Sequence, residues 1–269
     1  MQLFKKEFIF CPNKLKRMRK FILSIFTACT LFLTGCLETT QEITLNEDGS
    51  GTISNTNDMS ALIGMAKQMG GGGDMGKLPQ EAIDSIIMMT ERADSIPNLT
   101  PEERELARKG TLRINMDMKA DKFLTKLSFP FSTPSQIVLI NKLSGKMMSE
   151  TLKDKLSGSD TPIPMDQMPE ASSFDDYYTL EFSNGELTKK VNKEKYAGAE
   201  SDEYLKGIKQ AASMGLVMKA NYIINLPRPA SKAEGKNVKL SADKKQVTVS
   251  ADIDDFFEDA SSLEFKLKY

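Results

Sequence analysis

Residues 41–54, QEITLNEDGSGTIS, contain the pattern that decides the fold. Apolar and polar residues alternate up to Asn46, and a turn sequence around Asp48 and Gly49 separates this run from a second β-prone run at 52–54. An Asp-Gly pair between two such runs is a strong hairpin signal. We therefore predict an antiparallel hairpin at the N-terminal end of the folded region.

The same alternation with period two recurs along the rest of the chain. In a strand it places successive side chains on opposite faces of the sheet, so that one face is buried and the other is polar. Turn sequences such as Asn184-Gly185 separate several of these runs. The predicted strands cover 112–118, 123–131, 178–182, 187–191, 216–226, 238–251 (a hairpin) and 263–269.

Helices are predicted between these strands, where apolar residues recur at spacings of three and four. Each begins at a residue typical of a helix start, namely Asp58, Pro79, Thr100, Thr133 or Ser201. The helix after Pro79 would carry Ala82, Ile83, Ile86, Met89 and Ala93, and the helix after Thr133 would carry Ile137, Ile140, Leu143 and Met147 as far as about Leu152. The expected fold class is α+β, with a mainly antiparallel sheet built from hairpins and inserted helices packed on one face.

The N-terminal residues have the composition of an export signal. A basic stretch at 14–20 precedes 14 residues without charge, which are too few for a transmembrane helix of about 20 residues but suit the apolar part of a signal peptide. The run ends in Leu33-Thr34-Gly35-Cys36, which resembles the lipobox of bacterial lipoproteins. This resemblance implies cleavage before Cys36 and acylation of Cys36. The alternatives are an uncleaved anchor or a chance cysteine after an ordinary signal, and translation could start at Met1 or at Met18.

The predicted organisation is a lipoprotein signal peptide at 1–35, a lipidated tether at 36–40 and a single α+β domain at 41–269. A flexible loop is expected at 153–175, where Gly, Ser and Pro are frequent. Since Cys11 and Cys29 would be lost with the signal, the mature chain would have no disulfide. Two or three acyl chains on Cys36 would anchor the protein stably.

Charge and composition exclude several classes of function. The chain has no histidine, which removes Ser-His-Asp catalysis and imidazole-bound metals. Residues 1–35 hold seven of the 36 basic residues and one of the 37 acidic residues. Residues 36–269 therefore carry 29 basic and 36 acidic residues, a net charge of −7. An acidic domain is a poor partner for nucleic acid and is repelled by anionic headgroups. The acyl chains, not a basic patch, are therefore expected to attach the protein to a membrane.

Both ends of the predicted domain resemble a known family. The opening Asp48-Gly49-Ser50-Gly51-Thr52 and the late strand Asn221-Tyr222-Ile223-Ile224-Asn225-Leu226-Pro227 are similar to segments of LppM-type bacterial lipoproteins. The resemblance implies a lipidated cysteine and an α+β half-barrel sheet. It also implies a link to lipid binding in the cell envelope, as for some members.

Several motifs have both a functional and a structural interpretation. The glycines and lysine at 71–77 match the first part of a P-loop, but Leu78 replaces the Mg²⁺-binding Ser or Thr, which favours a linker.

The acidic residues around Phe256 and Phe257 have the oxygen ligands that Ca²⁺ prefers, yet a short helix with solvated acids explains them better. They are Asp252, Asp254, Asp255, Glu258 and Asp259. Asn46 and Asp48 suggest a Ca²⁺ loop, but hairpin chemistry explains them fully. We predict no metal site and no cofactor.

Two further features suggest a catalytic or a binding role. The paired carboxylates Asp175-Asp176 and Glu102-Glu103 would suit acid–base chemistry, although adjacent acids are common in loops and in first turns of helices. Methionines are frequent, with pairs at 88–89 and 147–148 that would line an apolar groove or fill a core.

The sequence as a whole predicts a lipid-anchored protein of a bacterial cell envelope, attached through Cys36, with no catalytic residues. Its domain is expected to bind a lipid or another hydrophobic ligand near the membrane. The alternative is a structural or assembly partner of an envelope protein, bound through a strand edge or the 153–175 loop. A hydrolase that uses the paired carboxylates is the lesser alternative. The sequence contains no recognisable signal that specifies which membrane leaflet holds the lipid.

Overall fold

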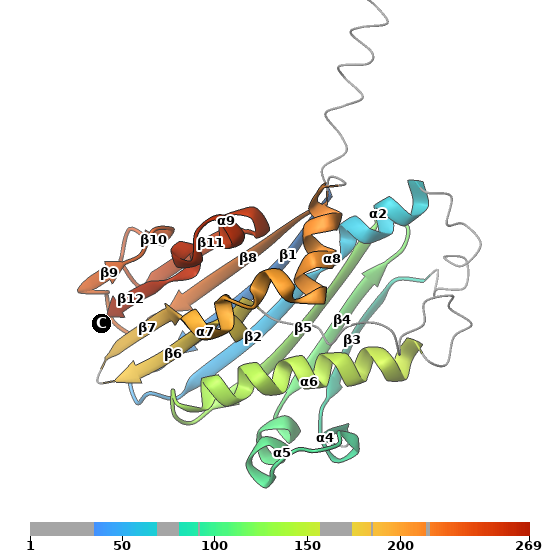
Figure 1. Ribbon diagram of the computed structural model, residues 1–269. Helices are drawn as coiled ribbons and strands as arrows, with labels where there is room; N and C mark the ends of the chain where they lie inside the picture. The colour runs from blue at the N-terminus through green and yellow to red at the C-terminus, as the bar shows by residue number, and fades with distance from the viewer. Residues whose placement is uncertain (1–34, 69–80, 91, 157–173, 184, 214–215) are drawn as a thin grey trace, which may run out of the picture. The chain divides into compact units, whose positions relative to one another are not determined.

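The computed structural model describes residues 35–68, 81–90, 92–156, 174–183, 185–213 and 216–269, which form two sheets and the helices packed on them (Figure 1). The large sheet has the strand order β10 (Val238–Leu240), β11 (Gln246–Asp252), β8 (Leu216–Asn225), β1 (Gly35–Leu45), β2 (Gly51–Asp58), β5 (Lys122–Phe131), β4 (Thr111–Asp117) and β3 (Ile83–Met88). The small sheet has the order β6 (Tyr178–Ser183), β7 (Glu186–Val191), β12 (Phe265–Lys268) and β9 (Lys232–Glu234).

Almost all neighbouring strands are antiparallel. The exception is β1, which pairs in parallel with β8 from Gly35 opposite Leu216 to Thr44 opposite Asn225. This pair joins the hairpin β1–β2, near the start of the described chain, to strands near its end. The fold class is α+β, as the sequence predicts.

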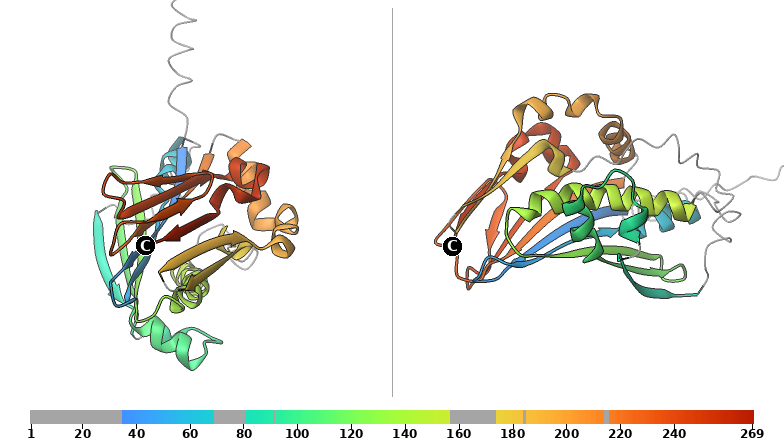
Figure 2. Two further views of the ribbon diagram at one scale, coloured as in Figure 1. Left: turned by 90° about the vertical axis from the view of Figure 1, so that its left-hand side faces the viewer. Right: turned by 90° about the horizontal axis from the view of Figure 1, so that it is seen from below.

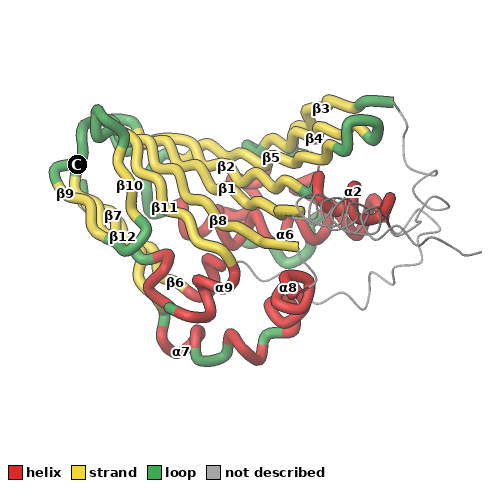
Figure 3. The backbone as a smooth tube through the Cα atoms, turned by 90° about the horizontal axis from the view of Figure 1, so that it is seen from above, coloured by secondary structure: helices red, strands yellow, loops and turns green. Residues whose placement is uncertain are grey.

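One face of the large sheet is covered by the small sheet and by α6, α8 and α9 (Figures 2 and 3). The helices are α2 (Ser60–Gln68), α4 (Arg92–Ser95), α5 (Pro101–Arg108), α6 (Gln136–Leu156), α7 (Lys193–Tyr196), α8 (Glu203–Ser213) and α9 (Ile253–Glu258). The described residues also form the 3-10 turns η2 (Phe174–Tyr177), η3 (Ala199–Ser201) and η4 (Ala260–Leu263). In the described ranges, no helix combines the length and apolarity that crossing a membrane requires.

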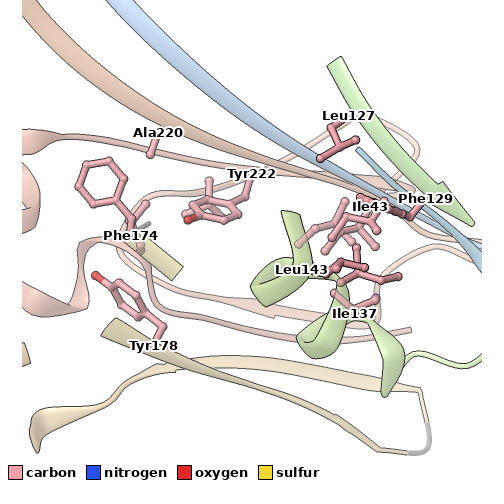
Figure 4. Packing of buried hydrophobic residues seen from close by; sticks show 14 of the residues in the cluster. Ile43, Leu127, Phe129, Ile137, Leu143, Phe174, Tyr178, Ala220 and Tyr222 are labelled. Carbon is pink, nitrogen blue, oxygen red and sulfur yellow. The ribbon is translucent and has the colours of Figure 1, made fainter. Parts of the chain in front are cut away.

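The core lies between the large sheet and α6. Figure 4 shows Ile43 and Phe129 of the large sheet beside Ile137 and Leu143 of α6. Ile53 and Leu127 of the sheet and Ile140 and Met147 of the helix belong to the same buried cluster, and none of these eight side chains is more than 1 % exposed. These four helix residues are the apolar positions predicted from the sequence. A second group surrounds the buried ring of Phe256, whose centroid lies 5.1–6.3 Å from five other rings.

Local signals in the sequence are confirmed where they specify turns and caps. The β1–β2 turn has Gly49 at φ 83°, and the Asp48 carboxylate accepts hydrogen bonds from the amide and the hydroxyl of Ser50. Thr100, a predicted helix start, forms a capping box with Glu103 at the start of α5. The predicted hairpins β4–β5, β6–β7 and β10–β11 are also present.

Other predictions are wrong in part. The helix expected after Pro79 is the strand β3 from Ile83 to Met88, which pairs with β4 along its whole length. Its β-branched isoleucines suit an extended chain, and the pairing with β4 outweighs the helical spacing. The predicted cap at Thr133 does not form, because the Gln136 side chain accepts a hydrogen bond from the Ser132 amide instead and α6 begins only at Gln136.

The structure describes the predicted tether and the two ends of the predicted loop. Residues 36–40, expected to be a tether, lie within β1 and pair on both sides, with β2 from Glu38 onward and with β8 from Gly35 onward. The signal peptide and most of the loop at 153–175 lie outside the described residues. The described edges of this loop are the end of α6 at Leu156 and the turn η2, which begins at Phe174.

Candidate functional site

A buried network of polar side chains lies between the large sheet, α6 and the small sheet. At its centre is Asp175 in η2, whose Oδ1 accepts hydrogen bonds from Lys189 Nζ at 2.5 Å and from the Tyr222 hydroxyl at 2.8 Å. The other carboxylate oxygen, Oδ2, accepts a hydrogen bond from Gln41 Nε2 at 2.9 Å. These four residues come from η2, β7, β8 and β1, so one carboxylate links four elements that are distant in sequence.

The network extends to the helix that covers the sheet. Gln41 Nε2 also lies 3.1 Å from Asn55 Oδ1 on β2 and 3.2 Å from Asn141 Oδ1 on α6. The Asn55 amide donates to Ser144 Oγ, which in turn donates to the Ile140 carbonyl within α6. The network therefore fixes the position of α6 on the sheet, because a buried polar group left without a partner costs about 1–3 kcal/mol.

Burial controls the electrostatics of the central pair. The Lys189 side chain is 3 % exposed, and its ammonium lies 3.5 Å from the centroid of the Tyr222 ring and 4.8 Å from that of Tyr178. Burial lowers the pKa of Lys189, although the Asp175 charge opposes this shift. Burial raises the pKa of Asp175, but the charge and the hydrogen bond of Lys189 outweigh it, so this pKa lies below its ordinary value. Asp175 and Lys189 thus form a buried ion pair, and Tyr222 and Gln41 also donate hydrogen bonds to its carboxylate.

An open groove lies beside this network. It has a volume of about 400 Å³ and runs between the start of α6 and the β6–β7 hairpin, next to the C-terminal residue Tyr269. Leu180 in its wall pairs directly across the strands with Lys189, and Val138 in the opposite wall is 50 % exposed. The complete lining is Pro134, Ser135, Val138, Leu180, Phe182, Ser183, Gly185, Glu186 and Tyr269. The groove thus lies at the surface, with the apolar side chains of Val138, Leu180 and Phe182 in its walls.

A second surface depression is polar. It has a volume of about 440 Å³ and includes Asp176, Tyr177 and Asp202, of which the last accepts a hydrogen bond from the Tyr177 hydroxyl at 2.7 Å. Its remaining lining residues are Lys195, Gly198 and Ser201. Its lining includes the charged side chains of Asp176, Lys195 and Asp202, whereas Glu186 is the one charged side chain in the lining of the first groove.

The structure does not bring the predicted carboxylate pairs together as acid and base. Asp175 is taken up by the buried network, whereas Asp176 is exposed in the second depression. Glu103 is buried and accepts a hydrogen bond from the Thr100 amide at 2.8 Å, while its neighbour Glu102 is exposed on α5. These contacts give Asp175 and Glu103 structural roles, which weakens the hydrolase interpretation.

The acidic cluster at 252–259 forms the predicted short helix α9, with Phe256 buried beneath it. Asp252 and Asp255 make a capping box at its N-terminus. Hydrogen bonds from the Ser261 hydroxyl and amide, and then from Lys236, lower the pKa of Asp259 to about 2. Across the ranges that the structure describes, no three acidic or thiol side chains converge in a way that could hold a metal ion.

The remaining candidate residues from the sequence are those of the predicted lipobox, the P-loop-like segment and the methionine pairs. The structure describes only some of them. The backbone of Cys36 lies in β1 opposite Val217, whereas Leu33 and Thr34 of the lipobox fall outside the described residues. The P-loop-like residues at 71–77 also lie outside them. Met147 is a core residue of α6, and Met88 and Met89 lie at the end of β3, where Met88 is 59 % exposed and Met89 is buried. None of these three methionines is among the residues that line the groove.

Sequence reasoning missed the polar network. One signal was present, because Gln41 and Lys189 occupy the same alternation as the apolar residues Ile43 and Leu187. A polar residue in a buried alternation position needs a buried partner. The sequence does not identify that partner.

Comparison with known proteins gives one structural relative. No protein-family model matches the chain, and no curated protein matches it. Among solved structures, it is similar to the folded domain of LppM from Mycobacterium tuberculosis, determined by NMR. The two share 10 % identity over 88 % of this chain and 92 % of that one, with a TM-score of 0.35. This relative is of the family that both ends of the sequence resemble.

Proposed function

We propose that this protein is a bacterial envelope lipoprotein, anchored by acyl chains on Cys36, whose non-catalytic domain binds a lipid or another hydrophobic ligand. The groove between α6 and the β6–β7 hairpin supports this proposal. It has room for part of an acyl chain, and its walls carry the apolar side chains of Val138, Leu180 and Phe182. Concave sites with mostly apolar walls are typical of small-molecule binding.

The partly exposed wall of the groove allows a direct test. A Val138→Asp variant of residues 36–269 is expected to bind a fluorescent fatty acid such as cis-parinaric acid about tenfold more weakly than the unchanged domain. The reason is that an acyl chain in the groove would desolvate the new carboxylate, and about 1.4 kcal/mol is a tenfold change in affinity. Fluorescence titration measures the two dissociation constants.

Val217→Asp is the matched control, because Val217 is also an exposed valine, at 38 %, but lies on β8 away from the groove lining. Its affinity for the probe should equal that of the unchanged domain. Equal weakening by both substitutions, or no binding by the unchanged domain, would remove the groove as the ligand site.

A second function, assembly with another envelope protein, is favoured by the edge of the large sheet. β3 is the last strand in the order, and its Ile86 and Met88 are 65 % and 59 % exposed. An edge strand with exposed apolar residues is suited to pairing with a strand of a partner.

For this second function, Ile86→Lys is expected to abolish the recovery of a crosslinked envelope partner, because a lysine on an edge strand opposes strand pairing. Val138→Asp should leave that recovery unchanged. The measurement is quantitative mass spectrometry of crosslinked complexes from cells that produce the full-length chain. A partner recovered equally with both variants would argue against binding at β3.

A further inference from the structure

The position of Cys36 in the sheet has a consequence for how the domain meets a membrane. We infer that the end of the large sheet where β1 begins lies against the bilayer surface, so that the sheet stands on the membrane with its β1–β2 turn pointing away. This inference rests on the proposed acylation of Cys36 and adds an orientation to it. The occupant of this surface is the lipid headgroup layer.

No tether separates Cys36 from the folded domain, because Cys36 already lies in β1. Cys36 lies opposite Val217 in the parallel β1–β8 pair, and β2 joins the other side of β1 from Glu38 onward. Any acyl chain on this residue would therefore be attached to the sheet itself. Flexible linkers let a domain move away from its anchor, and β1 provides no such segment.

Several elements share this end of the sheet. The pairing of Glu38 with Asp58, and of Asp58 with Leu124, brings the end of β2 and the beginning of β5 to the same edge as Cys36. The β4–β5 turn at 118–121 follows at this edge, since Asp117 pairs with Lys122. These elements would face the membrane together.

This end of the sheet is held rigidly. Lys67 of α2 donates to the Met118 carbonyl at 2.6 Å and forms an ion pair with Asp121 in the β4–β5 turn. At the other end of α2, the amide of Phe123 in β5 donates to the Ser60 hydroxyl at 3.0 Å. The helix and the turn thus form one surface with the beginning of β1.

The side chains at this end are compatible with a headgroup layer. Val217, directly opposite Cys36, is an exposed apolar residue at 38 %. Lys119 and Lys219 are exposed nearby, and a lysine can extend its ammonium toward water or a phosphate while its stem contacts apolar surface. The far end of β1 lies about 30 Å away, because nine steps from Cys36 to Leu45 each rise roughly 3.3 Å.

Fluorescent labels at the two ends test this orientation. Since the mature chain would have no other free thiol, Val217→Cys and Glu47→Cys each allow labelling at one position in the acylated protein. Lys119→Cys and Lys245→Cys form a second matched pair, with both lysines exposed in turns at opposite ends of the sheet. The labelled proteins are bound to phosphatidylcholine vesicles that carry a nitroxide quencher on some headgroups.

Labels at 217 and 119 are expected to lose at least twice as large a fraction of their fluorescence as labels at 47 and 245. Quenching at 47 or 245 equal to that at 217, or no quenching at any position on vesicle-bound protein, would overturn the inference. Flotation of the vesicles measures anchoring separately. Protein that carries no acyl chain and does not float would refute the proposed anchoring, and the orientation with it.

Discussion

A Cys36→Ala variant of the full-length chain is expected to lose all incorporation of a clickable fatty acid when it is produced in a bacterium that processes lipoproteins. The predicted lipobox at 33–36 contains one thiol, that of Cys36, and alanine has no nucleophilic atom in its place. The unchanged chain should carry the label and have the intact mass of residues 36–269 plus its acyl chains. In-gel fluorescence and intact mass spectrometry give these two measurements.

Cys29→Ala is the matched control, because Cys29 lies in the same apolar run but outside the lipobox. Its labelling and its mature mass should equal those of the unchanged chain. Label that depends on Cys29 instead of Cys36, or an unlabelled unchanged chain, would refute the lipoprotein assignment. Intact mass is needed because an uncleaved signal would also keep the chain on the membrane.

The second large effect concerns the buried network. Lys189→Ala is expected to lower the free energy of unfolding of residues 36–269 by about 3–5 kcal/mol, because it leaves the Asp175 carboxylate buried without its cation. The substitution also removes a cation from between the Tyr178 and Tyr222 rings. Urea unfolding followed by circular dichroism gives the change as a lower midpoint at an unchanged slope.

Arg113→Ala is the control for the loss of an ion pair at the surface. Arg113 binds Asp84 through two hydrogen bonds of 2.8 and 2.6 Å, but both side chains are about half exposed. Exposed pairs contribute only about 0–1 kcal/mol. If both substitutions cost the same, the network would contribute no more than a surface ion pair, and its proposed role in fixing α6 would be wrong.

The parts of the fold that depend on neighbouring residues could be predicted from the sequence. The β1–β2 turn needs Gly49 at positive φ, and the Thr100 capping box needs only residues three positions apart. The apolar face of α6 follows from a spacing of three and four. For β3 the same spacing was misleading, since the pairing partner that makes it a strand lies about 30 residues further along the chain.

The parts that depend on distant residues could not be predicted. Nothing in residues 35–44 or 216–225 specifies that they pair in parallel. The alternation of apolar and polar residues in β1 suits an antiparallel neighbour equally well. The polar network is harder to predict from the sequence than this strand pairing, since Asp175 and its partners come from separate elements. The groove beside it depends on how β6 meets α6, so only the apolar character of Val138, Leu180 and Phe182 could be anticipated.

The parallel pairing of β1 with β8 also sets the order of folding and of the proposed processing at Cys36. The bond between Gly35 and Cys36 lies inside that pair, whose other strand is about 180 residues further along the chain. A peptidase needs an extended, accessible segment, so the proposed cleavage and acylation must occur before residues 216–225 arrive and pair. Contacts between residues so distant in sequence form slowly. Late closure of this sheet would therefore give the processing enzymes time to act on a chain that is still unfolded.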